Sequence, residues 1–221
     1  MSNAEKALVE QLATFMAEAG FKWLKARAMF VRKELYGFSS LSWEFYWTGE
    51  GGGRLELVPL LAVRHNMVEG VVNELGLVYG EANRRFTATV DRGLGFFPFK
   101  EGRDEKRYIS RASVDADVEY VASSIASMLS GEGEMFFKKY SSLLECSRGL
   151  NDPIESITHP LCNNFPRRVY LGVAAAFFAE NKRVPELIAQ YLAFAKVVQP
   201  SQYGQIAKRL DQLMLVAQSK R

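Results

Sequence analysis

Two cysteines and two histidines are the residues of this chain best suited to metal binding or nucleophilic chemistry. Cys146, His159, Cys162 and His65 supply ligand types that zinc accepts. Their spacing lacks the close C-x-x-C pair of common structural zinc sites, so we predict neither a metal ion nor a cofactor. The simpler interpretation places Cys146 inside a helix as a small apolar residue and His159-Pro160 in a loop.

A cysteine can also act as a nucleophile when a histidine lies close enough to activate its thiol. A pair of carboxylates offers a second route to hydrolysis, and Glu44 and Glu56 lie on the polar face of a predicted hairpin, at a separation that depends on the strand register. Carboxylates beside Arg54 are more simply a solvated surface. We therefore keep a small hydrolase with a Cys/His or carboxylate site as an alternative and name no catalytic residue.

The glycine-rich segment Gly49–Gly53 resembles an anion-binding loop in composition. A phosphate-binding loop also needs a Lys-Ser/Thr pair and a following helix, and neither follows this segment. We interpret these glycines as a flexible hairpin turn.

Basic clusters raise the question of nucleic-acid binding. The clusters are Arg84-Arg85, Arg103 with Lys106-Arg107, and Arg167-Arg168. Most aromatic residues fall on predicted core faces, where they cannot stack on bases. A nucleic-acid accessory protein is thus a further alternative. The formal net charge of +3 is spread evenly along the chain, so attraction to nucleic acid would have to come from a folded basic patch.

A predicted β-hairpin between residues 41 and 64 positions several of these groups, because its apolar and polar residues alternate. The apolar face holds Leu41, Trp43, Phe45 and Trp47, and the polar face holds Ser42, Glu44, Tyr46 and Thr48. Three large aromatics on one face require a covering layer. In the second strand, Pro59 predicts a bulge or a break. Otherwise Val58, Leu60 and Ala62 form an exposed apolar stripe suited to a partner.

Helical and extended patterns alternate along the rest of the chain. Apolar spacing predicts helices near residues 7–16, 67–75, 113–128, 134–146, 168–180, 185–198 and 202–217. Further strands are predicted near residues 29–35, 86–90, 94–99 and 107–112. Together these patterns predict an α+β fold in which an N-terminal helix packs on a mainly antiparallel sheet of about five strands, followed by a C-terminal helical layer. We expect a sheet domain over residues 1–148 and a helical extension or subdomain over residues 149–221.

Composition is that of an ordinary globular protein. The chain has 221 residues, of which 48% are hydrophobic and 24% charged, so it can bury a sizeable core. The first twenty residues predict an amphipathic helix rather than a signal peptide, and the apolar run at 169–179 is too short to cross a bilayer. We therefore expect a cytoplasmic protein with reduced cysteines and no membrane contact.

The order of the predicted elements resembles that of a group of small bacterial proteins. An amphipathic helix, Gly20-Phe21, an aromatic strand with Phe30 and Arg32, and then alternating sheet and helices resemble small bacterial proteins that consist of domains of unknown function. Some similar α+β proteins are immunity partners that neutralise toxins. The resemblance covers about residues 5 to 145. It implies a bacterial cytosolic protein that works by contact, and it transfers no catalytic residue.

The leading expectation is therefore a non-enzymatic bacterial interaction protein, of the immunity or inhibitor type, that covers part of a protein partner. The predicted partner-binding residues are Glu44, Tyr46, Arg64 and His65. Alternation turns the first two outward, and the other two end the hairpin.

Overall fold

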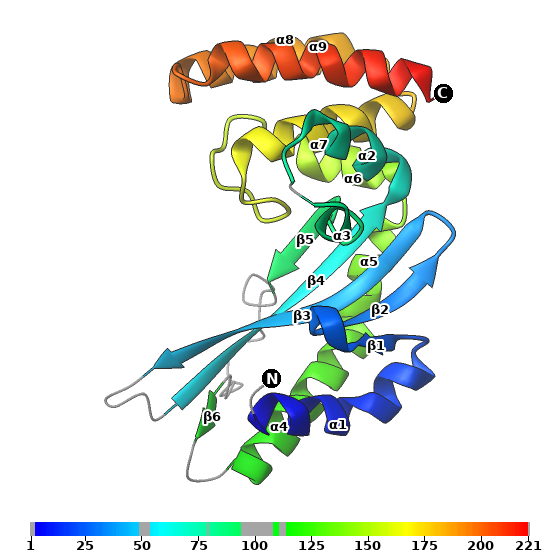
Figure 1. Ribbon diagram of the computed structural model, residues 1–221, viewed down its shortest axis with the longest axis vertical. Helices are drawn as coiled ribbons and strands as arrows, with labels where there is room; N and C mark the ends of the chain where they lie inside the picture. Colours follow the sequence, from blue (N-terminus) through cyan, green and yellow to red (C-terminus); the bar gives the residue numbers. More distant parts are fainter. Residues whose placement is uncertain (1–2, 49–53, 79, 94–107, 111–113, 221) are drawn as a thin grey trace. The chain divides into compact units, whose positions relative to one another are not determined.

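The computed structural model describes residues 3–48, 54–78, 80–93, 108–110 and 114–220 of the 221-residue chain (Figure 1). For residues 45–48, 54–56, 108–110 and 114–116 the structure describes the backbone but not the side chains. The fold is α+β, with an N-terminal helix, an antiparallel sheet and C-terminal helices, as the sequence predicts.

The sheet contains β1 (Lys22–Leu24), β2 (Met29–Glu34), β3 (Gly37–Thr48), β4 (Arg54–His65) and β5 (Val90–Gly93), hydrogen-bonded in that order. A short strand, β6 (Tyr108–Ser110), pairs antiparallel with β4. The register of β1 against β2 places Trp23 opposite Phe30. A 3-10 turn, η1 (Lys25–Arg27), joins these two strands, and the predicted hairpin corresponds to β3 and β4.

The strand β4 runs through Pro59 without a break. Leu57, Pro59 and Leu61 are buried, whereas Val58, Leu60 and Ala62 are half-buried. This regular alternation is that of an uninterrupted strand, so the predicted break is absent. The predicted apolar stripe on the second face is half-covered rather than exposed.

The chain divides into two compact units that alternate along the sequence. Unit 1 comprises Met1–Glu34, Phe38–Ala62 and Arg92–Phe137, and unit 2 comprises Leu35–Gly37, Val63–Asp91 and Lys138–Arg221. The boundary therefore does not fall at a single position near residue 149.

In unit 1, the helix α1 (Asn3–Glu18) packs against α4 (Val114–Met128). Leu8, Leu12 and Met16 form the buried side of α1, which includes the helix predicted near residues 7–16. Gly20 has a left-handed φ of 81° and ends the helix, as glycine at this position commonly does.

Aromatic rings fill another part of the unit 1 core. The rings of Trp23 and Trp43 stack at a centroid distance of 5.6 Å, and Phe30 contacts both. Trp43 and Leu41 are buried as predicted. Phe45 and Trp47, predicted on the same face, lie outside the described side chains.

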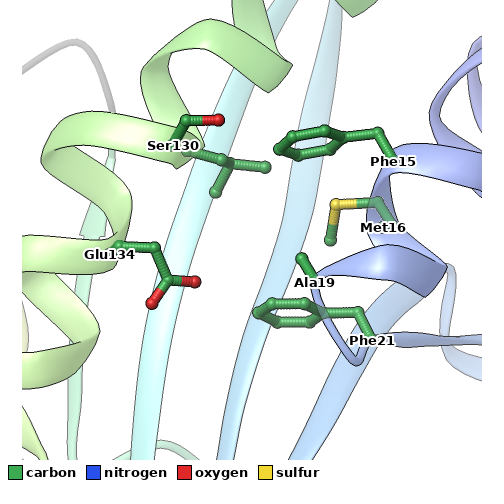
Figure 2. A pocket seen from close by; sticks show the side chains of 7 residues that line it. Phe15, Met16, Ala19, Phe21, Ser130 and Glu134 are labelled. Carbon is green, nitrogen blue, oxygen red and sulfur yellow. The ribbon is translucent and has the colours of Figure 1, made fainter.

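After α4 the chain forms a π-helix, η5 (Leu129–Gly133), before α5 (Glu134–Tyr140). Together with the end of α1, these residues enclose a small pocket of about 120 Å³ (Figure 2). The predicted helix over 134–146 is in fact two helices, because Ser142 caps a new helix, α6 (Leu143–Leu150), by accepting a hydrogen bond from the Glu145 amide.

Unit 2 is largely helical. Its helices are α2 (Asn66–Val72), α3 (Glu81–Arg84), α6, α7 (Phe165–Phe178), α8 (Val184–Val198) and α9 (Tyr203–Ser219), and a 3-10 turn, η3 (Asn73–Leu75), follows α2. The helix α7 contacts α2, α6, α8 and α9, so it is the centre of this unit (Figure 1). Its side chains from Val169 to Ala176 are accordingly buried.

The region between α2 and α4 departs most from the predicted pattern. Residues 86–88, predicted as strand, follow the short helix α3, and only Val90–Gly93 pair as β5. The predicted strand at 94–99 lies outside the described residues, whereas part of the strand predicted at 107–112 is present as β6.

Candidate functional site

Arg64, at the end of β4, is buried and bound to several backbone and side-chain acceptors. Its Nε donates to Asn66 Oδ1 at 2.9 Å, and its Nη1 donates to the carbonyl oxygens of Arg84 and Thr87 at 2.9 and 2.8 Å. Burial lowers the pKa of the guanidinium, and the nearby Glu69 carboxylate opposes that effect. Arg64 was predicted to contact a partner, but the structure gives its side chain an internal position.

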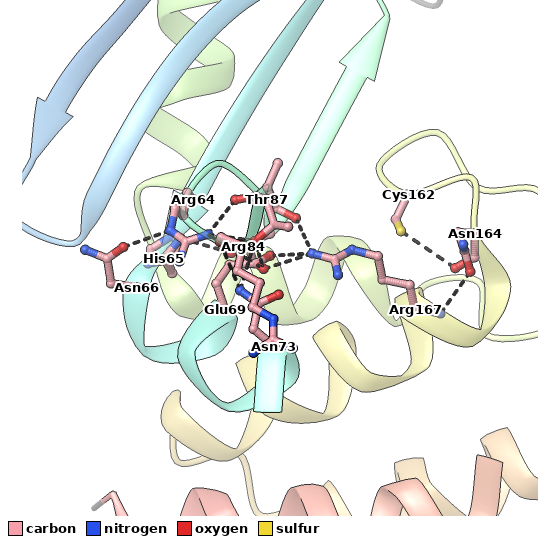
Figure 3. Close-up of polar contacts among 12 residues, drawn as sticks. Arg64, His65, Asn66, Glu69, Asn73, Arg84, Thr87, Cys162, Asn164 and Arg167 are labelled. Carbon is pink, nitrogen blue, oxygen red and sulfur yellow. Dashed lines mark hydrogen bonds and ion pairs between the residues drawn. The ribbon is translucent and has the colours of Figure 1, made fainter. Parts of the chain in front are cut away.

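Glu69 lies at the centre of a buried charge network, the Glu69 cluster, which consists of Arg64, Glu69, Thr87 and Arg167 (Figure 3). Arg167 Nη2 donates to both carboxylate oxygens, at 3.0 and 2.8 Å, and Arg64 Nη1 lies 3.9 Å from Oε2. The Thr87 hydroxyl donates to Oε2 at 2.5 Å. A fully buried carboxylate needs such partners, because an unpaired charge is costly in the interior.

The Glu69 cluster connects segments that are distant in sequence. Arg64 comes from β4, Glu69 from α2, Thr87 from the segment before β5, and Arg167 from the first turn of α7. Its contacts join four segments of unit 2 through one buried carboxylate, and we assign it a structural role.

His65, the other predicted contact at this end of β4, is buried as well. Its backbone N–H donates to Thr89 Oγ1 at 2.9 Å, and its ring Nε2 lies 2.8 Å from the Tyr140 carbonyl oxygen. Because that oxygen only accepts, Nε2 carries the proton in the neutral ring. Burial lowers the pKa of His65, and the bond to Tyr140 offsets part of that effect.

Cys146 shares its acceptor with His65. Its Sγ donates to the same Tyr140 carbonyl oxygen at 3.2 Å, so the structure brings one cysteine and one histidine together, as a Cys/His site requires. Burial raises the pKa of the Cys146 thiol to about 12, however, and the side chain is fully enclosed. A thiol at neutral pH is a weak nucleophile, so this pair has the features of a structural contact.

Cys162 and His159 also lie close together, within a local turn. The Cys162 amide donates to the His159 carbonyl oxygen at 3.2 Å, and the His159 ring accepts from the Leu161 amide and contacts the Asp152 carbonyl oxygen. Burial raises the pKa of Cys162 and lowers that of His159. Across the part of the chain that the structure describes, no three His, Cys, Asp or Glu residues are grouped as a metal site would require.

The basic clusters contribute mainly to internal contacts. Arg84 Nε donates to the Val78 carbonyl oxygen at 2.8 Å, and Arg167 belongs to the Glu69 cluster. Arg168 is fully buried, and its guanidinium donates to the carbonyl oxygens of Leu150, Pro153, Ile154 and Ser156. Arg85 is exposed and pairs with Glu81. Arg103, Lys106 and Arg107 lie outside the described residues.

Glu44 is exposed on β3, on the outward face that alternation predicts. The side chains of Tyr46 and Glu56 are not among those described, and the segment Gly49–Gly53 lies outside the described residues. The predicted carboxylate pair and the predicted turn of the hairpin therefore stay predictions.

The structure also reveals a surface feature that alternation failed to predict, the Leu35 turn (Leu35, Tyr36 and Gly37). The strand predicted over residues 29–35 includes Leu35, but β2 ends at Glu34 and the Leu35 side chain is fully exposed, at 109%. An apolar residue one position past a strand carries no distinct sequence signal.

Contacts with His65 and Asn66 fix the conformation of the Leu35 turn. The Tyr36 ring stacks on the His65 ring at 4.6 Å, and the Tyr36 carbonyl oxygen accepts from the Asn66 amide at 2.8 Å. A Cβ atom at Gly37 would lie only 2.1 Å from the Arg64 carbonyl oxygen, so the backbones are in close contact there. Arg64 and His65 thus support the turn that presents Leu35.

Two further findings bear on the class of protein. In the described part of the chain, every helix is too short or too polar to span a lipid bilayer. Comparisons with protein-family models, with curated proteins and with solved structures each found no match.

Proposed function

We propose that this chain is a non-enzymatic bacterial interaction protein of the immunity or inhibitor type, which acts in the cytosol by covering the active site of a protein partner. The observation that carries the proposal is the fully exposed Leu35 side chain, which lies on a turn that His65 and Asn66 hold in place through Tyr36. A preorganised apolar contact loses little conformational freedom on binding, so most of its burial contributes to affinity.

Single exposed apolar residues are common on protein surfaces, so a binding surface needs further exposed apolar residues near Leu35. Met67 is also exposed, at 53%, and it follows Asn66, whose amide bonds to Tyr36. Leu35 and Met67 thus flank one backbone hydrogen bond. Two exposed apolar side chains beside an aromatic ring resemble the apolar centre of a protein interface.

The experiment compares proteins captured from bacterial lysate by the wild-type chain and by Leu35→Asp. Burying a leucine side chain contributes about 1.5–3 kcal/mol to binding, so Leu35→Asp should lower the affinity for the partner by roughly 10- to 100-fold. Val197→Asp is the matched control, because Val197 is 79% exposed on α8 and lies outside the Leu35 turn. Quantitative mass spectrometry of the captured proteins is the measurement.

A protein that is retained by the wild type and by Val197→Asp but lost by Leu35→Asp supports the proposal. Its activity should then fall when the wild-type chain is added and stay unchanged with Leu35→Asp. Equal capture by all three chains contradicts the assigned surface, and a partner whose activity is unaffected contradicts the inhibitory role. Glu44→Lys tests, in the same assay, the separate partner contact that the sequence predicts at Glu44.

A further inference from the structure

The pocket of unit 1 has a lining that is almost entirely apolar. Figure 2 shows Phe15, Met16, Ala19 and Phe21, from the end of α1 and the residues after it, facing Ser130 and Glu134 across the space. Leu129 completes the lining. The volume of about 120 Å³ is somewhat below that of the roughly 150 Å³ engineered cavity known to hold benzene, so one small ring or short aliphatic group fits.

One wall of the pocket is built by an unusual backbone. Ser130 and Leu129 belong to the π-helix η5, and Glu134 begins α5 directly after it. Single π-turns within helices are rare and occur often at functional sites. Here the π-turn places a serine hydroxyl and a carboxylate beside an apolar space.

One group of three ion-paired residues lies beside the pocket, and Glu134 is its member that lines the pocket. The Arg32 guanidinium lies between two carboxylates, with Nε 2.8 Å from Glu34 Oε1 and Nη1 2.7 Å from Glu134 Oε1. Two carboxylates against one guanidinium leave one net negative charge. An anionic ligand would meet repulsion there, whereas a cationic ligand would be attracted.

Glu134 has acceptor capacity left for a ligand. Arg32 donates to its two oxygens at 2.7 and 3.4 Å, and a carboxylate has about four acceptor positions. The Glu134 side chain is 47% exposed, so a ligand can reach it. The Phe15 ring at the same pocket favours a cation further, whereas the Phe21 ring already has the Arg32 guanidinium over it.

We propose that this pocket binds a small primary amine, with an apolar body no larger than a benzene ring in the cavity and its ammonium group on the Glu134 carboxylate. Arg32 is a positioning residue in this site, because it holds Glu134 and stacks over the Phe21 and Phe137 rings at 4.7 and 5.4 Å. The inference is independent of the proposed function, since it uses neither Leu35 nor any residue that supports it.

The test is an NMR titration of the full-length protein with three probes that share a phenyl ring: benzylamine, phenylacetate and toluene. Benzylamine should bind in the millimolar range or tighter and shift the backbone amides of Ala19, Phe21, Ser130 and Glu134. Phenylacetate, whose charge is reversed, should bind at least about tenfold more weakly, which corresponds to about 1.4 kcal/mol.

Variants separate the cavity from the charge. Glu134→Gln should weaken benzylamine about tenfold or more while leaving toluene unchanged. Ala19→Leu should fill the cavity and abolish the binding of all three probes. Glu10→Gln, an equal charge change at an exposed position of α1, is the control and should bind like the wild type.

Equal affinities for benzylamine and phenylacetate would overturn the proposal, as would binding of toluene alone or shifts confined to other residues. The proposal is also overturned if the wild-type protein shows no binding of benzylamine in the millimolar range. If Ala19→Leu fails to fold, the comparison of Glu134→Gln with the wild type decides the question alone.

Discussion

Cys146 and Cys162 show how burial determines the reactivity of a side chain. Both thiols are enclosed and donate to backbone carbonyl oxygens, and burial raises the pKa of each, that of Cys146 to about 12. We expect neither cysteine to react with a thiol reagent in the native protein at pH 8, whereas both should react rapidly in denaturant. A colorimetric thiol assay measures this, and rapid native labelling of Cys146 would restore the Cys/His alternative.

His65 predicts a pH dependence of stability. Its folded pKa lies below the ordinary value of about 6.5, so the unfolded chain binds more protons as the pH falls below that value. The free energy of unfolding should therefore be unaffected by His65 above about pH 7.5 and fall on acidification, by at most about 1.4 kcal/mol per pH unit.

His65→Phe tests this origin, because phenylalanine can keep the ring contact with Tyr36 but cannot titrate. Urea unfolding between neutral and mildly acidic pH should show a shallower slope for His65→Phe than for the wild type. The pH dependence that remains in His65→Phe should include a contribution from His159, because burial also lowers the pKa of His159. Identical slopes for the two proteins would contradict the assignment.

At the residue scale, sequence alternation predicted outward-facing Glu44 and the buried Leu41 and Trp43 correctly. It could not predict that Arg64 and His65 are enclosed, because both contact residues that are distant in sequence, as Arg64 does with Thr87 and His65 with Tyr140. Leu35 was misplaced for a related reason, since strand periodicity does not show where a strand ends.

The Glu69 cluster stabilises the elements of unit 2 through one buried carboxylate. Glu69→Ala should lower the free energy of unfolding by about 3–5 kcal/mol, because it leaves Arg64 and Arg167 without their shared partner. Glu81→Ala is the control, since its carboxylate is exposed and pairs with the exposed Arg85. Urea denaturation of both variants measures the difference, and equal stabilities would show that the cluster contributes little.

The junction of β3 and β4 depends on the close approach at Gly37. A methyl group there would lie 2.1 Å from the Arg64 carbonyl oxygen, so Gly37→Ala must displace one backbone, at a cost of about 1–3 kcal/mol. Gly204→Ala is the matched control, because nothing lies within 4 Å of its added Cβ and alanine favours helices. Thermal melts should show a lower Tm only for Gly37→Ala, and an unchanged Tm there would contradict the close contact.

At the element scale, long segments with regular apolar spacing were predicted well, as α1, α4, α7, α8 and α9 show. The π-helix η5 and the short helix α3 were missed, because neither is long enough to show a period. The division between α5 and α6 depends on Ser142, whose cap occurs within an otherwise continuous helical pattern.

At the scale of the whole molecule, the two compact units each consist of three separate stretches, so the chain passes between them five times. Sequence predicted a division near residue 149, because proline-rich irregular sequence is typical of a linker. Packing between distant segments, such as α2 with α7, instead defines the units, and periodicity contains no information about it.

This interleaving predicts that a fragment of residues 1–148 does not fold cooperatively. Val68, Val71 and Val72 are fully buried on α2, which contacts α7, and the fragment lacks α7. We expect a broad, non-cooperative urea transition and binding of a hydrophobic dye, in contrast to the full chain. A sharp transition with a dispersed NMR spectrum would show that the fragment is autonomous.

The exposure of Leu35 also has an evolutionary consequence. A side chain that lies wholly in solvent can be exchanged by one codon change at little cost to the fold, whereas Gly37 and the buried residues behind it tolerate few replacements. Under the proposed function, substitutions at position 35 would therefore change the choice of partner while leaving the framework intact.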